Sequence, residues 1–165
     1  MPTCLWPWGR CRRMPDGRSA WRNDRTWQQR VARDRELLRE RLDDDQMTVA
    51  RGVVEAADTQ GALDFVVVFG SVARGDHHDE SDLDIYFEAG DLNAPYDIPH
   101  PDFPEYQILG LPTGGLLDAL RAGQDFAFNV VRDGLIHVDN GHYRDVLVAV
   151  DEEGLAPDEP AGAQA

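Results

Sequence analysis

The chain contains a short, wholly apolar run that ends in a glycine, and few folds accommodate this pattern. Residues 65–69 read FVVVF and are followed by Gly70 and Ser71. Five consecutive Val and Phe residues are too few for an ordinary helix, and the glycine bounds them, so they predict a buried β-strand. We expect the chain to turn sharply at the end of this strand, because glycine has no Cβ atom.

Two aspartates follow this turn on a second expected strand. Asp82 and Asp84 are separated only by Leu83, and polar and apolar residues alternate from there to Glu88. This alternation is typical of a half-buried strand, and it places both aspartates on one face, roughly 6.5 Å apart. Two carboxylates at this spacing repel each other unless a cation lies between them. Such oxygen ligands suit Mg²⁺, which typically binds one or two carboxylates together with water and phosphate.

The bend at Gly70 and Ser71 has the features that phosphate binding requires. Gly70 lets the backbone approach a ligand closely. Ser71 stands where a helix could begin, with its hydroxyl and free backbone N–H groups available to an anion. Arg74, one turn later, could offer its guanidinium to phosphate. A Gly-Ser turn before an acidic edge strand would explain the acids individually, but not the order of strand, turn and strand.

Gly70, Ser71, Asp82 and Asp84 together form the pattern GS-x10-DxD. This pattern resembles the signature of the DNA polymerase beta superfamily of nucleotidyltransferases. The resemblance implies an α+β, two-layer nucleotidyltransferase fold, with a small mixed sheet of about four strands and helices packed on one face. It also implies that the aspartates hold two Mg²⁺ ions and that the glycine and serine bind the phosphates of ATP.

Two further features match the longer motif GSxxRG…SDxD of the minimal nucleotidyltransferases. Arg74 precedes Gly75, and Ser81 precedes the first aspartate. The resemblance implies that Arg74 and Ser81 belong to the nucleotide-binding site, where Arg74 neutralises phosphate charge. A looser likeness in the order of elements extends to around residue 140.

Side chains alternate between two faces over residues 105–111, and this alternation predicts the next strand. A third carboxylate is expected on that strand. The resemblance implies that this acid helps to hold the catalytic metal and takes the proton of the attacking hydroxyl. Strand register places Gln107 closest to that position and Glu105 one pleat earlier on the same face. Glutamine cannot act as a general base and is a weak ligand for Mg²⁺. Glu105 is therefore the candidate catalytic and metal-binding residue. The presence of Gln107 leaves open the alternative that the domain has lost its catalytic activity.

The nucleotidyltransferase domain is expected to span residues 24–150. Residues 1–23 predict a disordered or wrongly assigned N-terminal arm, and residues 151–165 a disordered acidic tail. Four prolines between residues 95 and 104 predict an irregular loop. Apolar periodicity and turn residues predict the remaining elements, which are helices over residues 24–43, 45–58, 116–122 and 126–132, a strand over 135–138 and a helical or extended piece over 143–150.

Charge is unevenly distributed along the chain. The net charge is −15, and all 16 basic residues are arginine. Residues 1–41 contain 11 arginines and 5 acids, whereas residues 42–165 contain 5 arginines and 26 acids. This acidic folded region disfavours a nucleic acid partner, because its carboxylates would repel the phosphates of the nucleic acid. The absence of lysine indicates a halophilic source, with codon bias in a GC-rich genome as the alternative.

The sequence predicts a cytoplasmic protein that does not bind membranes. It has no run of 18 apolar residues of the kind that spans a bilayer. It also has no charged and apolar leader that ends in a small-residue cleavage site.

The acceptor of the nucleotide is expected on a second chain. Larger superfamily members, such as aminoglycoside transferases and tRNA-end-adding enzymes, resemble this chain but carry an extra helical domain for their acceptors. Here residues 141–165 alone follow the closing strand. The chain is similar to minimal nucleotidyltransferase antitoxins, which attach AMP to a tyrosine of a helical HEPN-type RNase toxin, and the resemblance implies that partner. The alternatives are a degenerate binding domain and an aminoglycoside-type small-molecule nucleotidyltransferase.

Overall fold

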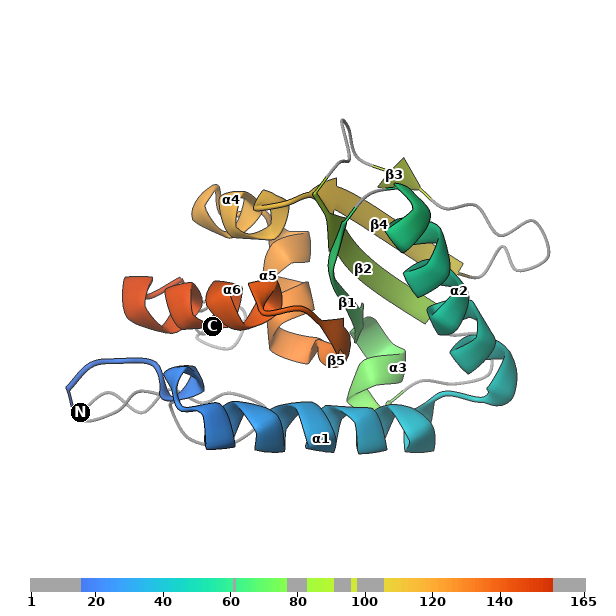
Figure 1. Cartoon of the computed structure of the whole chain (residues 1–165), viewed down its shortest axis with the longest axis horizontal. Helices are drawn as coiled ribbons and strands as arrows, with labels where there is room; N and C mark the ends of the chain where they lie inside the picture. Colours follow the sequence, from blue (N-terminus) through green and yellow to red (C-terminus); the bar gives the residue numbers. More distant parts are fainter. Residues whose placement is uncertain (1–15, 61, 77–82, 91–95, 98–105, 156–165) are drawn as a thin grey trace, which may run out of the picture.

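The computed structural model describes residues 16–60, 62–76, 83–90, 96–97 and 106–155 (Figure 1). Its centre is a mixed five-stranded sheet in the order β3-β4-β2-β1-β5. The strands are β1 (Leu63–Phe69), β2 (Leu83–Ala89), β3 (Tyr96–Asp97), β4 (Tyr106–Pro112) and β5 (Leu135–Asp139). The helices are η1 (Ala20–Arg22), α1 (Asp24–Arg41), α2 (Asp44–Gln60), α3 (Gly70–Arg74), α4 (Gly115–Arg121), α5 (Asp125–Asp133) and α6 (His142–Glu153). The predicted α+β class is confirmed.

The strand β1 is buried on both faces, as its unbroken apolar run predicts. Phe65 and Val67 contact one core, and Val66 and Val68 contact the other. Its neighbour β2 was expected to be half-buried, and this is wrong because β2 lies in the middle of the sheet. It pairs antiparallel with β1 and parallel with β4. Polar alternation on a central strand therefore marks buried polar groups rather than a solvent-exposed face.

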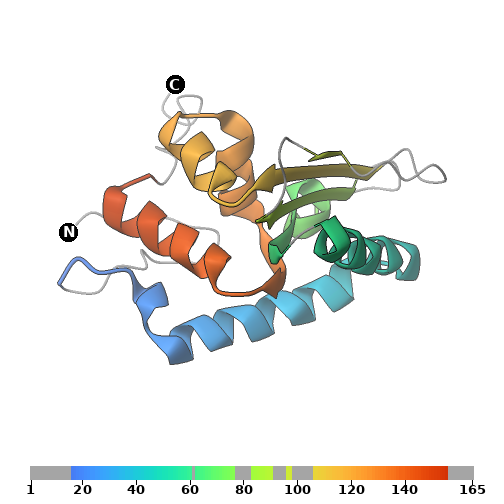
Figure 2. The same ribbon diagram turned by 45° about the horizontal axis from the view of Figure 1, so that its top comes forward.

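Helices cover both faces of the sheet, so the expectation of helices on one face is wrong. On one face, α2 packs against β1 and β2, with the C-terminal part of α1 and the short helix α3 beside it. On the other face, α4, α5 and α6 enclose a second core. Figure 2 shows α2 on one side of the strands and α4 and α5 on the other. A strand that is apolar on both faces requires this second layer.

The edge of the sheet at β5 is closed by α1. Asp34 on α1 accepts a hydrogen bond from the backbone N–H of Ile136 (3.0 Å), and Arg30 donates to the carbonyl of Gly134 (3.0 Å). The two side chains also pair with each other at 2.9 Å and are almost fully buried. The two side chains thus satisfy backbone N–H and carbonyl groups at this edge, which could otherwise pair with another strand.

The folded domain extends beyond residues 24–150 at both ends. Trp21 is 3% exposed and packs in the second core. The hydroxyl of Ser19 donates to Asp151 (2.6 Å), and Arg22 donates to Glu152 (2.8 Å). These contacts place residues 19–23 and 151–153 in the domain, whereas residues 1–15 and 156–165 lie outside the described residues.

The region around the expected proline-rich loop contains one short strand. The two residues of β3 pair antiparallel with Gly110 and Leu109 of β4, and this pairing was not predicted.

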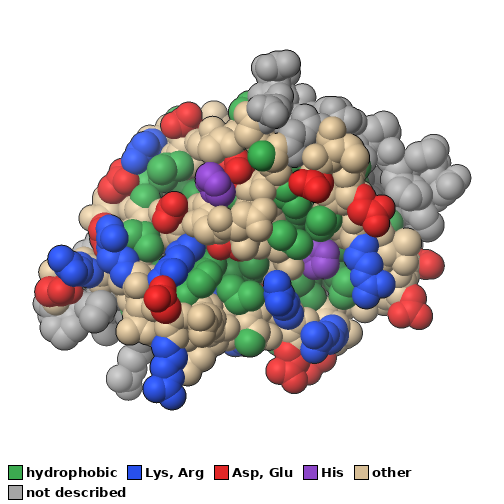
Figure 3. Space-filling model, in the orientation of Figure 1, with side chains coloured by type: hydrophobic (Ala, Val, Ile, Leu, Met, Phe, Trp, Pro, Cys, Tyr) green, Lys and Arg blue, Asp and Glu red, His purple; other side chains and the backbone are tan. Residues whose placement is uncertain are grey.

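No helix in the described ranges is long and apolar enough to cross a membrane. On the face that Figure 3 shows, arginine side chains lie among acidic ones and do not form one continuous basic surface.

Candidate active site

The bend after β1 depends on the absence of a side chain at Gly70. This glycine has a φ of +79°, a conformation that residues with a side chain rarely adopt. A Cβ atom there would lie 3.2 Å from Cγ of Asp84 and still closer to one of its carboxylate oxygens. The backbone therefore turns directly against the Asp84 carboxylate.

Asp84 reaches this position through strand register. It lies opposite Phe69, the last residue of β1, on one side and beside Gln107 of β4 on the other. The residue is partly buried. The structure thus brings together the glycine and the second aspartate of the motif, which are 14 residues apart in the sequence.

Ser71 and Arg74 lie on α3, the short helix that the bend begins. Ser71 is partly buried, and its carbonyl accepts hydrogen bonds from the N–H groups of Gly75 (3.0 Å) and Asp76 (3.2 Å). Arg74 donates to Asp76 (3.1 Å) and to Asp133 of α5 (2.8 Å). These hydrogen bonds raise the pKa of Arg74, with Asp76 as the larger cause. The guanidinium is thus held by two carboxylates, and its role in phosphate binding stays a prediction.

Three of the predicted site residues, Asp82, Ser81 and Glu105, lie outside the described residues, and their roles stay predictions. The side chain beside Asp84 on the next strand is Gln107, which is exposed. The parallel register of β2 and β4 pairs Gln107 with Asp84, and its place at the position of the third carboxylate stays a prediction.

The residues around the bend suit a hard cation bound together with phosphate. The Asp84 carboxylate offers oxygen ligands next to a backbone that carries no Cβ at Gly70. Within the described part of the chain, no group of three or more His, Cys, Asp or Glu side chains could hold a metal ion.

Glu88, on the same face of β2 as Asp84, does not belong to this site. It is 1% exposed and accepts hydrogen bonds from the Tyr86 hydroxyl (2.7 Å) and from the N–H groups of Gly114 (3.0 Å) and Leu116 (2.7 Å). Burial raises the pKa of its carboxyl, while these three hydrogen bonds act in the opposite direction. Glu88 therefore fixes the start of α4.

The sequence analysis missed Asp133, the buried carboxylate that binds Arg74. Its side chain is 2% exposed and also accepts two hydrogen bonds from Arg132, each at 3.1 Å. The local signal was the dipeptide Arg132-Asp133 at the end of an amphipathic helix. That signal gives no indication of Arg74, which lies 59 positions earlier.

Comparison with known proteins agrees with this geometry. Residues 52–98 match the family model described as polymerase beta, nucleotidyltransferase. This segment runs from α2 through β1, the bend, α3 and β2 to β3. No curated protein matches the chain. The matched segment supports a nucleotidyltransferase of the polymerase beta superfamily, which is the family that the motif resembles.

Proposed function

We propose that the protein transfers AMP from ATP to a hydroxyl group in a Mg²⁺-dependent reaction. The observation that carries this proposal is the contact between the Asp84 carboxylate and the bend at Gly70, where any side chain would displace the acid. This contact brings an oxygen ligand for a metal to a backbone turn that an anion can approach closely.

In the proposed mechanism, the backbone at Gly70 and Ser71 binds the β- and γ-phosphates, and Asp82 and Asp84 would hold Mg²⁺. Bound Mg²⁺ would neutralise charge on the phosphates. The attacking hydroxyl approaches the α-phosphate opposite the leaving pyrophosphate, and Glu105 orients that hydroxyl or takes its proton.

The proposed acceptor is a tyrosine of a partner HEPN-type toxin, so that the protein acts as an antitoxin. The packing of the C-terminal helices supports an acceptor on another chain. Helices α4, α5 and α6 all bury side chains in the core behind the sheet and do not form a separate acceptor domain. The resemblance to minimal nucleotidyltransferases supplies the identity of the partner.

A second candidate function is a nucleotidyltransferase-fold domain that binds its partner without catalysis. The observation that favours it is the position of Gln107 beside Asp84, where a third carboxylate would complete the metal site. A glutamine there provides neither a general base nor a strong Mg²⁺ ligand.

Incubation of the protein with α-labelled ATP, Mg²⁺ and a candidate HEPN-type toxin tests these functions. The proposal predicts label on the toxin, and loss of that label with Asp84→Asn. Asp118→Asn is the matched control, because Asp118 is exposed on α4, away from the bend. Partner binding without label would support the degenerate domain. Label on an aminoglycoside in the absence of a partner would instead support the small-molecule alternative.

A further inference from the structure

A cleft of about 360 Å³ lies between α1, α3 and α5 and concentrates arginine side chains. In Figure 1, α3 lies against the C-terminal half of α1. Such a volume is within the range of small-molecule sites. We call it the arginine cleft and define it by six charged lining residues, Arg33, Arg41, Arg74, Arg132, Asp76 and Asp133. Four cations and two anions give its lining an excess of positive charge, although the whole chain carries −15.

The buried carboxylate of Asp133 orients two of these arginines. It accepts hydrogen bonds from Arg74 and Arg132, and its side chain is 2% exposed, whereas theirs are 41% and 40% exposed. The anion therefore lies beneath the two cations and fixes their planes, while their outer edges face the solvent of the cleft. An arginine whose orientation is already fixed loses less conformational entropy when it binds a ligand.

The hydrogen bonds of these two arginines leave donors for a ligand. Arg132 uses Nε and Nη2 toward Asp133 and Asn129, and Arg74 uses Nε and Nη1 toward Asp76 and Asp133. Within the described ranges, Nη1 of Arg132 and Nη2 of Arg74 make no hydrogen bond to protein. Paired guanidinium N–H groups match the oxygen geometry of phosphate.

Arg41 holds the opposite wall of the cleft in place. Its guanidinium donates to the carbonyl of Ala73, which connects α1 to α3. Ala73 is three residues after Gly70, so the cleft begins about 4.5 Å along the helix axis from the bend. The cleft thus adjoins the candidate active site and shares Arg74 with it, while its other charged lining residues lie outside that site.

We propose that the arginine cleft binds a phosphate group. Two sources carry this chemistry, namely a phosphate of the nucleotide held at the bend and a phosphate on the acceptor. A concave site lined by oriented guanidinium groups favours a compact phosphate over an extended acidic peptide, which needs a longer row of cations.

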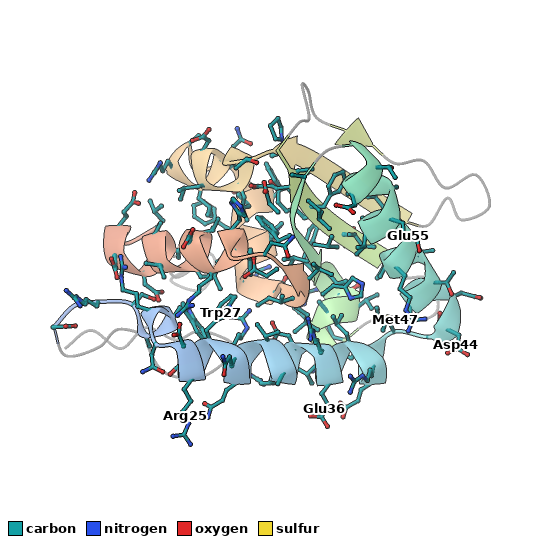
Figure 4. All side chains as sticks on the ribbon, in the orientation of Figure 1. Arg25, Trp27, Glu36, Asp44, Met47 and Glu55 are labelled. Atoms are coloured by element: carbon teal, nitrogen blue, oxygen red, sulfur yellow. The ribbon has the colours of Figure 1, made fainter. Side chains whose placement is uncertain are left out.

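Calorimetric titration with pyrophosphate at low ionic strength, without Mg²⁺, tests the cleft directly. We expect the wild-type protein to bind, and Arg132→Gln or Arg33→Gln to raise the Kd about tenfold each, as loss of a hydrogen bond to a charged group predicts. Arg25→Gln is the matched control, because it makes the same charge change on the outer side of α1, where Arg25 points away from the fold (Figure 4). Added salt should weaken binding in the wild type.

A second titration in the presence of saturating ATP and Mg²⁺ separates the two sources. Loss of pyrophosphate binding assigns the cleft to a phosphate of the nucleotide, and retained binding assigns it to the acceptor. Three results would overturn the proposal, namely no binding by the wild type, an equal loss in Arg25→Gln, or tighter binding of an oligoglutamate peptide than of pyrophosphate. Because Arg33 is exposed, its variant should fold even if Arg132→Gln does not.

Discussion

Gly70→Ala should impair the candidate active site much more than it impairs the fold. The φ of +79° at this position costs a residue with a Cβ atom about 1–2 kcal/mol. Alanine also reduces the conformational entropy of the unfolded chain, which raises the free energy of unfolding by about 0.4–1 kcal/mol. The new Cβ would press on the Asp84 carboxylate, and overpacking of this kind costs about 1–3 kcal/mol more. The free energy of unfolding should therefore fall by about 1–5 kcal/mol, which does not exceed the stability of about 5–15 kcal/mol that is typical of a domain.

The effect on nucleotidyl transfer should be larger, because the substitution displaces Asp84. A misplacement of about 1 Å in a catalytic arrangement costs roughly 100-fold in rate. Urea denaturation measures the stability of the variant, and transfer of labelled AMP measures its rate.

Gly123→Ala separates backbone strain from the clash with Asp84. Gly123 has a φ of +75°, close to that of Gly70, but a Cβ there would meet no atom within 4 Å. We expect this control to lose about 1 kcal/mol of stability and to keep full activity. The reasoning is refuted if Gly70→Ala retains wild-type activity, or if both variants lose activity equally.

Three further predictions concern the edge of the sheet, the terminal contacts and the third carboxylate. Asp34→Ala should lower the free energy of unfolding by about 3–5 kcal/mol in urea, because it removes the carboxylate that pairs with the buried Arg30 guanidinium. Hydrogen bonds from Arg22 lower the pKa of Glu152 to about 2, whereas the ordinary pKa of a glutamate is 4.5. The stability that Glu152 contributes is therefore present above pH 4.5 and is lost as the pH falls toward 2. Unfolding of Glu152→Gln should accordingly depend less on pH in this window. Gln107→Glu should increase Mg²⁺-dependent transfer, because it adds a carboxylate beside Asp84.

Each of these predictions has a contradicting result, and Asp34→Ala also has a matched control. Glu36→Ala changes an acid on the outer side of α1 (Figure 4), and a loss as large as that of Asp34→Ala would contradict the role of the buried pair. A pH profile of Glu152→Gln identical to that of the wild type would show that this carboxyl does not contribute. Unchanged or reduced transfer by Gln107→Glu would place the third acid elsewhere.

The local pattern predicted the parts of the fold that depend on neighbours in the sequence. The FVVVF run predicted a buried strand, and the alternation before Glu88 predicted the next strand. Antiparallel pairing of these two strands then brings Asp84 to the end of β1, next to Gly70. These elements follow from periodicity and from the shortness of the connection between them.

The sequence could not predict contacts that depend on distant parts of the chain. The periodicity of α5 indicates an apolar face, but not which side of the sheet it covers. The same holds for Asp133 and Arg74, whose ion pair forms only when α5 packs beside α3. Trp21 lies in the arm that was predicted to be disordered or wrongly assigned, yet it packs in the second core. Glu88 fits the alternating pattern of Asp84 but is buried as a helix cap, because a central strand has no solvent-exposed face.

Calorimetric titration with ATP, in the presence and absence of Mg²⁺, tests most directly whether the bend and Asp84 bind a metal–triphosphate complex. The account predicts that the wild-type protein and Asp118→Asn bind ATP more tightly with Mg²⁺ and that Asp84→Asn loses this Mg²⁺ dependence. Equal affinity of the wild type and Asp84→Asn for ATP at saturating Mg²⁺ would contradict it.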